Sequence, residues 1–355
     1  MGVGTFTKLK NDILNADQLP QLRSLRDQFQ LSIQQNEQLH KDSIAELNNL
    51  INDIHDALIV KTISLAEIRM VGEGLGPPPA SYSYLLLGSA GRSEQTMASD
   101  QDSALIYEDH TASEKTKAYF LTFTQYVVSM LMELGYPPCD GKVQSNESMW
   151  CQSESEWKEK LEQWFQDADW ESVRYLLIVA DARCIAGDDL LFNRIRTFFE
   201  QGLVRYTNML ERMIENTVQH KVVVGIFGQF ITDRYGDHVG SIDVKYGSYI
   251  PIVNSVRWLS LNAAISETST LSRLEKLKER GQFSEEDYEK YRKAFLQMLS
   301  LRLLAGYHEE DGMYKGYSKL NPKRLDSDEI KRLKRNLRYG KEVQKLVLKE
   351  MARHK

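Results

Sequence analysis

The chain has 355 residues, which suffices for two or three domains with a sizeable core. Its 42% hydrophobic and 27% charged residues are typical of a globular protein and exclude a disordered chain. Lysine and arginine number 45 against 50 aspartate and glutamate residues, so the formal net charge is −5. That balance lacks the basic surplus of most nucleic-acid-binding proteins, and a nucleic-acid partner is therefore not favoured.

The cysteines and the apolar segments bear on location. Cys139, Cys151 and Cys184 are an odd number without metal-ligand spacing, which fits free thiols in a reducing compartment. The first residues, MGVGTFTKLKND, lack the apolar core of a secretory signal, and no apolar run is long enough to span a bilayer. We expect a cytoplasmic protein without a membrane partner.

Residues 5–70 are predicted to be helical, with Pro20 in the first turn of a helix or in the loop before it. Apolar residues recur there at spacings of three and four positions, a stripe that typically packs against a neighbouring helix: Ile44, Leu47, Ile51, Ile54 and Leu58. His40 and His55 fall on polar faces and are expected to be solvated. The glycines and prolines of residues 72–79 end this helical region.

The most informative segment covers residues 84–107. The apolar runs at 85–87 and 104–107 predict two short buried strands. Gly88 and Ser89 follow the first run and predict a turn that a phosphate can approach, because glycine has no Cβ. Asp100 and Asp102 precede the second run. Side chains alternate along extended backbone, so both carboxylates are expected on one face, roughly 7 Å apart.

Two carboxylates beside such a turn suit Mg²⁺ and a nucleoside triphosphate. Mg²⁺ prefers one or two carboxylates together with phosphate oxygens, and a pair of such ions can clamp the attacking and leaving oxygens of an in-line displacement. The alternative is structural, since the sequence Ser-Asp-Gln-Asp at 99–102 also has the composition of a polar turn or a helix cap.

The spacing Gly-Ser, ten residues, Asp-x-Asp resembles the signature of the polymerase-β-like nucleotidyltransferase superfamily. The fuller pattern, which adds Gly91, Arg92 and Glu94, is similar to the PII-protein uridylyltransferases. It resembles most of all the nucleotidyltransferases that carry a helical C-terminal substrate-binding domain. The resemblance implies transfer of a nucleoside monophosphate from an NTP.

Residues 113–143 are expected to complete a small catalytic core. Ser113 and residues 115–134 predict an amphipathic helix, which Gly135 ends in the left-handed conformation. Residues 135–143 are expected to form the next strand. The superfamily often takes a third carboxylate from that strand, and Asp140 is the nearest candidate, although its position between Cys139 and Gly141 favours a turn. Whether catalysis uses two carboxylates or three stays open.

From residue 153 onwards the chain is predicted to be helical. Four aromatic residues at helical spacing are expected in the core: Trp157, Trp164, Phe165 and Trp170. Residues 176–183 are predicted to form the interior of a buried helix, and Asp181 and Arg183 resemble a polar step of the family's helical domain. Further helices are expected at 193–235 and 252–306, and residues 307–355 are expected to form a charged helical tail.

A second informative string, Ser-Ile-Asp-Val-Lys-Tyr-Gly-Ser at 241–248, resembles an Asp-x-Lys-x-Gly element of the same helical domain. The resemblance implies that Lys245 neutralises a triphosphate and that Asp243 orients Lys245 or holds a metal. The alternative is a surface ion pair that braces a loop.

These features together predict an α+β, mostly helical protein. A helical region (1–75) is expected to precede a small mixed-sheet nucleotidyltransferase core (76–152), and a helical, substrate-binding domain (153–355) to follow it. Asp100 and Asp102 would hold Mg²⁺ or Mn²⁺, Gly88 and Ser89 would hold the phosphates, and Arg92 would balance the leaving pyrophosphate or pin Glu94.

The expected activity is metal-dependent nucleotidyl transfer from an NTP to an acceptor. The resemblance favours a protein hydroxyl as acceptor, as in the PII uridylyltransferases. The alternatives are a nucleotide-binding regulator without turnover and a helical scaffold that binds no nucleotide. Which NTP is used stays open, as does the oligomeric state, a homodimer included.

Overall fold

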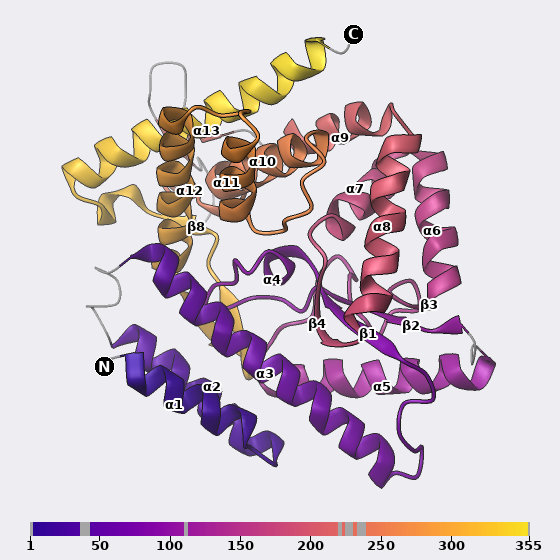
Figure 1. Cartoon of the computed structure of the whole chain (residues 1–355). Coiled ribbons are helices and arrows are strands. Elements are labelled where there is room, and N and C mark those ends of the chain that lie inside the picture. Colours follow the sequence, from indigo (N-terminus) through magenta and orange to yellow (C-terminus); the bar gives the residue numbers. More distant parts are fainter. Residues whose placement is uncertain are drawn as a thin grey trace. The chain divides into compact units, whose positions relative to one another are not determined.

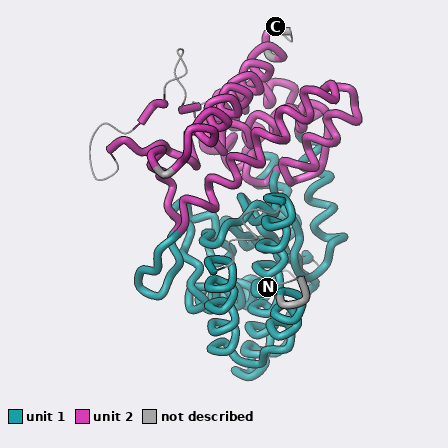
Figure 2. The backbone as a smooth tube through the Cα atoms, turned by 90° about the vertical axis from the view of Figure 1, so that its left-hand side faces the viewer, with its two compact units in different colours: residues 1–163, 181–202, 307–315 teal, residues 164–180, 203–306, 316–355 magenta. Residues whose placement is uncertain are grey.

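The computed structural model describes residues 3–35, 43–109, 113–218, 222–223, 230–232 and 239–353. The chain forms two compact units, shown in Figure 2. The first comprises residues 1–163, 181–202 and 307–315, and the second comprises residues 164–180, 203–306 and 316–355. The fold is α+β and mostly helical, which confirms the predicted class. The three-domain division at residues 75 and 152 stays a prediction.

The first unit is built on a four-stranded mixed sheet with the strand order β3-β2-β1-β4 (Figure 1). Strands β1 (Tyr82–Leu86) and β2 (Ser103–Tyr107) are antiparallel, with Leu86 opposite Ser103. Strand β4 (Arg183–Gly187) pairs antiparallel with β1, and β3 (Cys151–Ser153) pairs parallel with β2. Every residue of β1 and β2 is buried, which explains their continuous apolar runs. Because β1 ends where β2 begins, the segments that leave β1 and enter β2 meet at one end of the sheet.

Two long helices of this unit end where their sequences predict, and the second also begins where its sequence predicts. Helix α3 (Ile44–Gly72) starts after Ser43, whose side chain accepts a hydrogen bond from the Glu46 N–H. Helix α5 (Glu114–Glu133) starts after the capping residue Ser113, and Gly135 follows it with φ +89°. Helix α3 contacts both α5 and α1 (Val3–Leu14), and helix α2 (Leu19–Gln34) has Pro20 in its first turn. Apart from Ile44, the predicted stripe of α3 is buried.

Aromatic contacts join α5 to the sheet. The Phe120 ring stacks on Tyr107 of β2, with ring centroids 4.9 Å apart, and also contacts Tyr82 of β1. The remaining elements of this unit are the one-turn helix α4 (Gly88–Gly91), the first part of α6 (Glu154–Asp167), most of α8 (Asp189–Arg205) and a hairpin of β6 (Tyr307–Glu310) with β7 (Met313–Gly316).

Three predictions of secondary structure were wrong. Residues 135–143 form turns rather than a strand, since Pro137 and Pro138 lack the N–H groups that strand pairing needs. Residues 176–183 do not form one helix, because α7 (Trp170–Val179) ends before β4. The β6–β7 hairpin interrupts the expected helical tail. Its turn is made by Asp311 and Gly312, which both have positive φ.

Two side-chain predictions were also wrong. His55 is fully buried rather than solvated, and Trp170 is 47% exposed rather than part of the core. The other three aromatic residues of that set, Trp157, Trp164 and Phe165, are buried as predicted. His40 lies outside the described residues.

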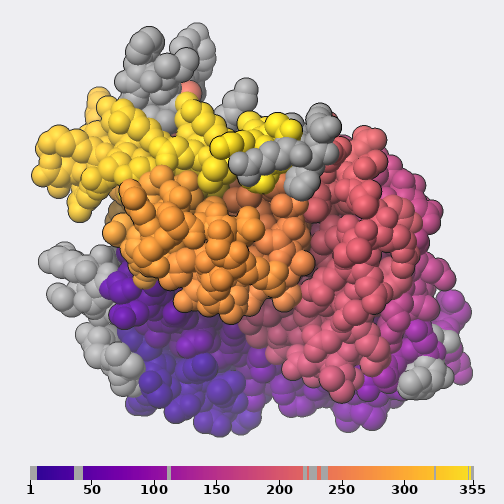
Figure 3. Space-filling model, turned by 45° about the horizontal axis from the view of Figure 1, so that its top comes forward, coloured from indigo at the N-terminus to yellow at the C-terminus, as the bar shows by residue number. Residues whose placement is uncertain are grey.

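The second unit consists mainly of helices. They are α7, α9 (Met209–Val218), α10 (Ile250–Asn262), α11 (Thr270–Glu279), α12 (Glu285–Ala305) and α13 (Ser327–Arg353). Helix α13 packs against α10 and α12, and Figure 3 shows it in yellow across the orange helices. Short strands β5 (Ile242–Asp243) and β8 (Lys319–Leu320) pair beside a π-helical turn, η2 (Lys245–Tyr249), and a 3₁₀ turn, η3 (Pro322–Arg324), leads into α13.

The predicted helical stretch at 193–235 corresponds to α8 and α9, and most of its remainder lies outside the described residues. Throughout the described part of the chain, helices fall short of the length and apolar character that crossing a membrane requires.

Candidate active site

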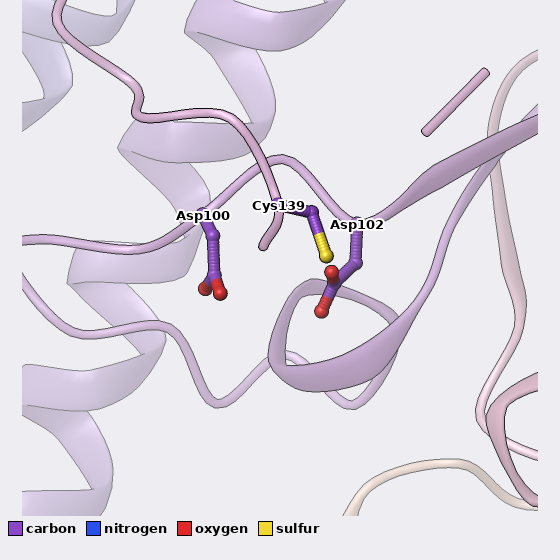
Figure 4. A group of neighbouring side chains, drawn as sticks. All are labelled: Asp100, Asp102 and Cys139. Atoms are coloured by element: carbon purple, nitrogen blue, oxygen red, sulfur yellow. The ribbon is translucent and has the colours of Figure 1, made fainter. Parts of the chain in front are cut away.

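Asp100 and Asp102, the acid pair, lie directly before β2. One ligand atom from each of Asp100, Asp102 and Cys139 lies within 4.8 Å of the other two, and all three residues are half-buried. Figure 4 shows these side chains as close neighbours. The two carboxylates therefore lie close together, as their spacing of two residues predicts. Among the described residues, no other group of three His, Cys, Asp or Glu side chains has the spacing of metal ligands.

Gly88, the first residue of α4, touches the acid pair. Its φ of +54° is in the left-handed region, and a Cβ at this position would lie 2.2 Å from Asp102 Oδ2. The preceding Leu87 N–H donates to the Asp102 carbonyl oxygen at 2.9 Å. Only glycine avoids both the backbone strain and the clash. The turn predicted for phosphate binding and the acid pair are thus parts of one small site.

Arg92 lies in a buried ion network next to α4. Its Nε donates to Glu94 Oε2 at 2.8 Å, its Nη1 donates to Asp181 Oδ2 at 2.7 Å, and the residue is only 5% exposed. The predicted pairing of Arg92 with Glu94 is therefore present, while contact with a leaving pyrophosphate stays a prediction. Gly91 allows this packing, because a Cβ there would lie 2.0 Å from the Asp181 carbonyl oxygen.

Arg183 of β4 holds α4 from a second direction. It donates two hydrogen bonds of 2.9 Å to the Asp56 carboxylate of α3, and its Nη2 also donates to the Ala90 carbonyl oxygen at 3.0 Å. Sequence reasoning assigned Asp181 and Arg183 to the helical domain. They belong to the first unit because β4 pairs with β1. These strands are about a hundred residues apart, and no local sequence pattern predicts their pairing.

Buried polar side chains of α2 and α3 hold the segment between α4 and the acid pair. Asn48 donates to the Gln95 carbonyl oxygen at 2.9 Å, and Asn52 Oδ1 accepts the Gln95 N–H at 3.0 Å. Gln30 donates to the Met97 carbonyl oxygen at 2.7 Å. These bonds satisfy backbone groups that a buried loop would otherwise leave unpaired, so they fix its path.

His55 completes this set as a neutral side chain. Its Nε2 lies 3.0 Å from the Thr96 carbonyl oxygen, which can only accept, so Nε2 carries the proton and Nδ1 accepts from the Tyr136 hydroxyl at 2.7 Å. Burial, assisted by the nearby Arg26 charge, lowers the pKa of His55 to about 3. The imidazole therefore works as a structural hydrogen-bonding group.

The other predicted metal ligands have different surroundings. Asp140 is exposed and lies in a turn, as its neighbours in the sequence suggested. Asp243 belongs to the second unit, where its Oδ1 accepts the N–H groups of Lys245 and Tyr246 and its Oδ2 pairs with Lys319 at 3.2 Å. Lys245 is half-buried at the start of η2. The roles of Asp243 and Lys245 in nucleotide binding stay predictions.

The acid pair fits a hard divalent cation. Two carboxylates supply oxygen ligands, and because Gly88 has no Cβ, its backbone can lie directly against Asp102 Oδ2. Burial, and then the Asp102 carboxylate to which the thiol is hydrogen-bonded, raise the pKa of Cys139 to about 12. Without a cation, this cysteine is therefore a protonated neighbour of the acid pair.

Comparison with known families agrees with this geometry. A model described as "Putative nucleotidyltransferase DUF294" matches residues 31–171, which include α3, the sheet strands β1–β3 and the acid pair. A model described as "Putative nucleotidyltransferase substrate binding domain" matches residues 207–351. A search among curated proteins gave no match. The two matches support nucleotidyl transfer, and the chain belongs to the nucleotidyltransferase family with a helical C-terminal domain that these models describe.

Proposed function

We propose that the protein is a metal-dependent nucleotidyltransferase that moves a nucleoside monophosphate from an NTP to an acceptor hydroxyl. The observation that carries the proposal is the contact between Gly88 and Asp102, which joins a tight glycine turn to a pair of carboxylates. A phosphate chain and its cation need both features at one place.

Asp100 and Asp102 are the residues that would hold Mg²⁺ or Mn²⁺. When bound, such a cation neutralises triphosphate charge and favours in-line displacement at phosphorus. Gly88 and Ser89 would bind phosphate oxygens through backbone N–H groups and the Ser89 hydroxyl. Arg92 and Glu94 would act indirectly, because their buried ion pair keeps α4 oriented.

The reaction itself asks little covalent chemistry of the protein. The acceptor oxygen forms a bond to the α-phosphorus, the bond from that phosphorus to the bridging oxygen breaks, and pyrophosphate leaves, while the hydroxyl proton passes to solvent. Positioning and charge stabilisation supply the rate enhancement. Lys245 of the second unit would add a positive charge for the triphosphate, and Asp243 would orient Lys245 or add a metal ligand.

We propose a protein hydroxyl as the acceptor, in the manner of the PII uridylyltransferases. The pattern of residues 88–102 supports this class of acceptor through its resemblance, and the net charge of −5 disfavours RNA.

The test incubates the protein with each of the four labelled NTPs, Mg²⁺ and a lysate from its source. We expect one NTP to label a protein band, with loss of the label in Asp100→Ala. Asp140→Ala is the matched control, because Asp140 is an exposed aspartate in a nearby turn, and it should label normally. Labelling that persists in Asp100→Ala would reject the assigned metal site.

A second candidate is a nucleotide-binding regulator that does not turn over. The observation in its favour is that the third group beside the acid pair is the Cys139 thiol rather than a carboxylate. Calorimetric titration with Mg-NTP, followed by an assay for pyrophosphate, separates the two functions. Binding with pyrophosphate release supports the transferase, whereas binding without release supports the regulator.

A further inference from the structure

Cys139 occupies the place where a third carboxylate was expected. Its Sγ lies within 4.8 Å of a ligand oxygen of both Asp100 and Asp102, whereas Asp140 is exposed. We infer that Cys139 is a third ligand of the metal site and that its sulfur biases the site towards thiophilic divalent cations such as Zn²⁺, relative to Mg²⁺. This inference rests on the proposed function, because it assigns a ligand to the same site.

The start of β2 holds the thiol in place. The Val143 N–H is hydrogen-bonded to Cys139 Sγ, and the Val143 carbonyl oxygen accepts from the Ser103 N–H at 3.1 Å. The Ser103 hydroxyl oxygen in turn accepts the Ser145 N–H at 3.1 Å. Ser103 directly follows Asp102, so the same strand end positions the carboxylate and the sulfur. A ligand set held in this way does not have to be assembled when the metal arrives.

Two carboxylate oxygens and one sulfur form a ligand set that suits Zn²⁺ better than Mg²⁺. Mg²⁺ takes oxygen ligands in a strict octahedral arrangement and rarely accepts sulfur. Thiolate sulfur is a soft ligand that Zn²⁺ binds at about 2.3 Å together with carboxylate oxygens. As the bond between sulfur and metal forms, the bond between sulfur and hydrogen breaks and the proton passes to solvent. The thiol thus adds affinity for a thiophilic cation and little for Mg²⁺.

The other two cysteines offer internal controls. Cys151 is fully buried in β3, and Cys184 in β4 is half-buried, with its thiol donating to the Ala186 carbonyl oxygen at 3.4 Å. Neither belongs to a group of three metal-ligand side chains among the described residues. Cys184→Ser therefore makes the same chemical change as Cys139→Ser, at a half-buried cysteine outside the candidate site.

The experiment titrates the metal-free full-length protein with Cd²⁺, whose bond to thiolate sulfur gives a charge-transfer band in the ultraviolet. We expect the band in the unmodified protein and in Cys184→Ser, and its loss in Cys139→Ser and Cys139→Ala. The Cd²⁺ dissociation constant should rise at least about tenfold in both Cys139 variants. Calorimetry with Mg²⁺ should give almost the same affinity in all four proteins, and unfolding midpoints establish that each variant is folded.

Several results would overturn the inference. A band that persists in both Cys139 variants would place the cadmium on another thiol. Equal losses of Mg²⁺ and Cd²⁺ affinity would show that Cys139 only supports the structure. If the unmodified protein binds Mg-NTP but gives no cadmium band, Cys139 is not a ligand and the proposed function stands. If it binds neither Mg²⁺ nor Cd²⁺, both proposals fail.

Discussion

The contact between Gly88 and Asp102 predicts a substitution that damages metal binding more than stability. In Gly88→Ala, the new methyl group would lie 2.2 Å from Asp102 Oδ2, whereas ordinary contact begins at 3.4 Å. The carboxylate must therefore withdraw by about 1.2 Å. The left-handed φ of +54° adds a backbone cost of about 1–2 kcal/mol for alanine. A displacement of this size at a reacting centre lowers activity by roughly 100-fold.

Gly74→Ala is the matched control for this prediction. Gly74 also has a left-handed φ, +79°, but a Cβ at this position would meet nothing within 4 Å. Urea unfolding should therefore show a loss of about 1–2 kcal/mol in each variant. Calorimetric titration with Mg²⁺ or Mn²⁺ should show weakened binding in Gly88→Ala alone. If Gly88→Ala bound metal as tightly as Gly74→Ala does, the glycine turn and the acid pair would not form one site.

Three further predictions concern the groups that support this site. Asp181→Ala removes one carboxylate partner of the buried Arg92 guanidinium, and urea unfolding should show a loss of about 3–5 kcal/mol. Asn48→Ala removes the closer of two amide donors to the buried Gln95 carbonyl oxygen, the other being Asn52 at 3.5 Å, for an expected loss of about 1 kcal/mol in the same assay. His55 stays neutral in the folded protein down to about pH 3, whereas the unfolded chain takes up this proton near pH 6.5, so stability falls as the pH drops through that window. The contribution of His55 to the slope of the free energy of unfolding against pH should approach about 1.4 kcal/mol per pH unit. Urea unfolding between about pH 7.5 and pH 5 measures this slope, and the contribution should disappear in His55→Gln.

The proximity of the glycine turn and the acid pair could be predicted from local patterns, because both lie close together in the sequence. The two strands, the glycine turn and the acid pair occupy residues 82–107, so turn chemistry and side-chain alternation were enough to relate them. The end of α3 could also be predicted from neighbouring residues, because Gly72 and the glycines and prolines after it stop a helix.

The parts that the sequence did not predict depend on contacts between distant segments. The local sequence of β4 is typical of the end of a helix, but in the structure these residues pair with β1. Gly187 allows the close approach of β4 to the Tyr82 carbonyl oxygen. His55 looked solvated because a polar face of a helix is usually exposed, but α3 contacts helices on more than one side. Cys139 is a single thiol in a turn, and a single residue makes no pattern. Its position beside Asp102 follows from the hydrogen bonds that join residues 143–145 to Ser103.

Strand pairing, rather than the long connection between the strands, sets the distance from the glycine turn to the acid pair. Leu86 pairs with Ser103, and the next hydrogen bond along, from the Leu87 N–H to the Asp102 carbonyl oxygen, places Gly88 against the Asp102 carboxylate. A slip of one residue would turn each side chain of β2 to the opposite face and bring a neutral neighbour of Asp102 to Gly88. Because every residue of β1 and β2 is buried, such a slip would disrupt the core on both faces of the sheet. The apolar residues of these two strands therefore determine the geometry of the site as well as the stability of the fold.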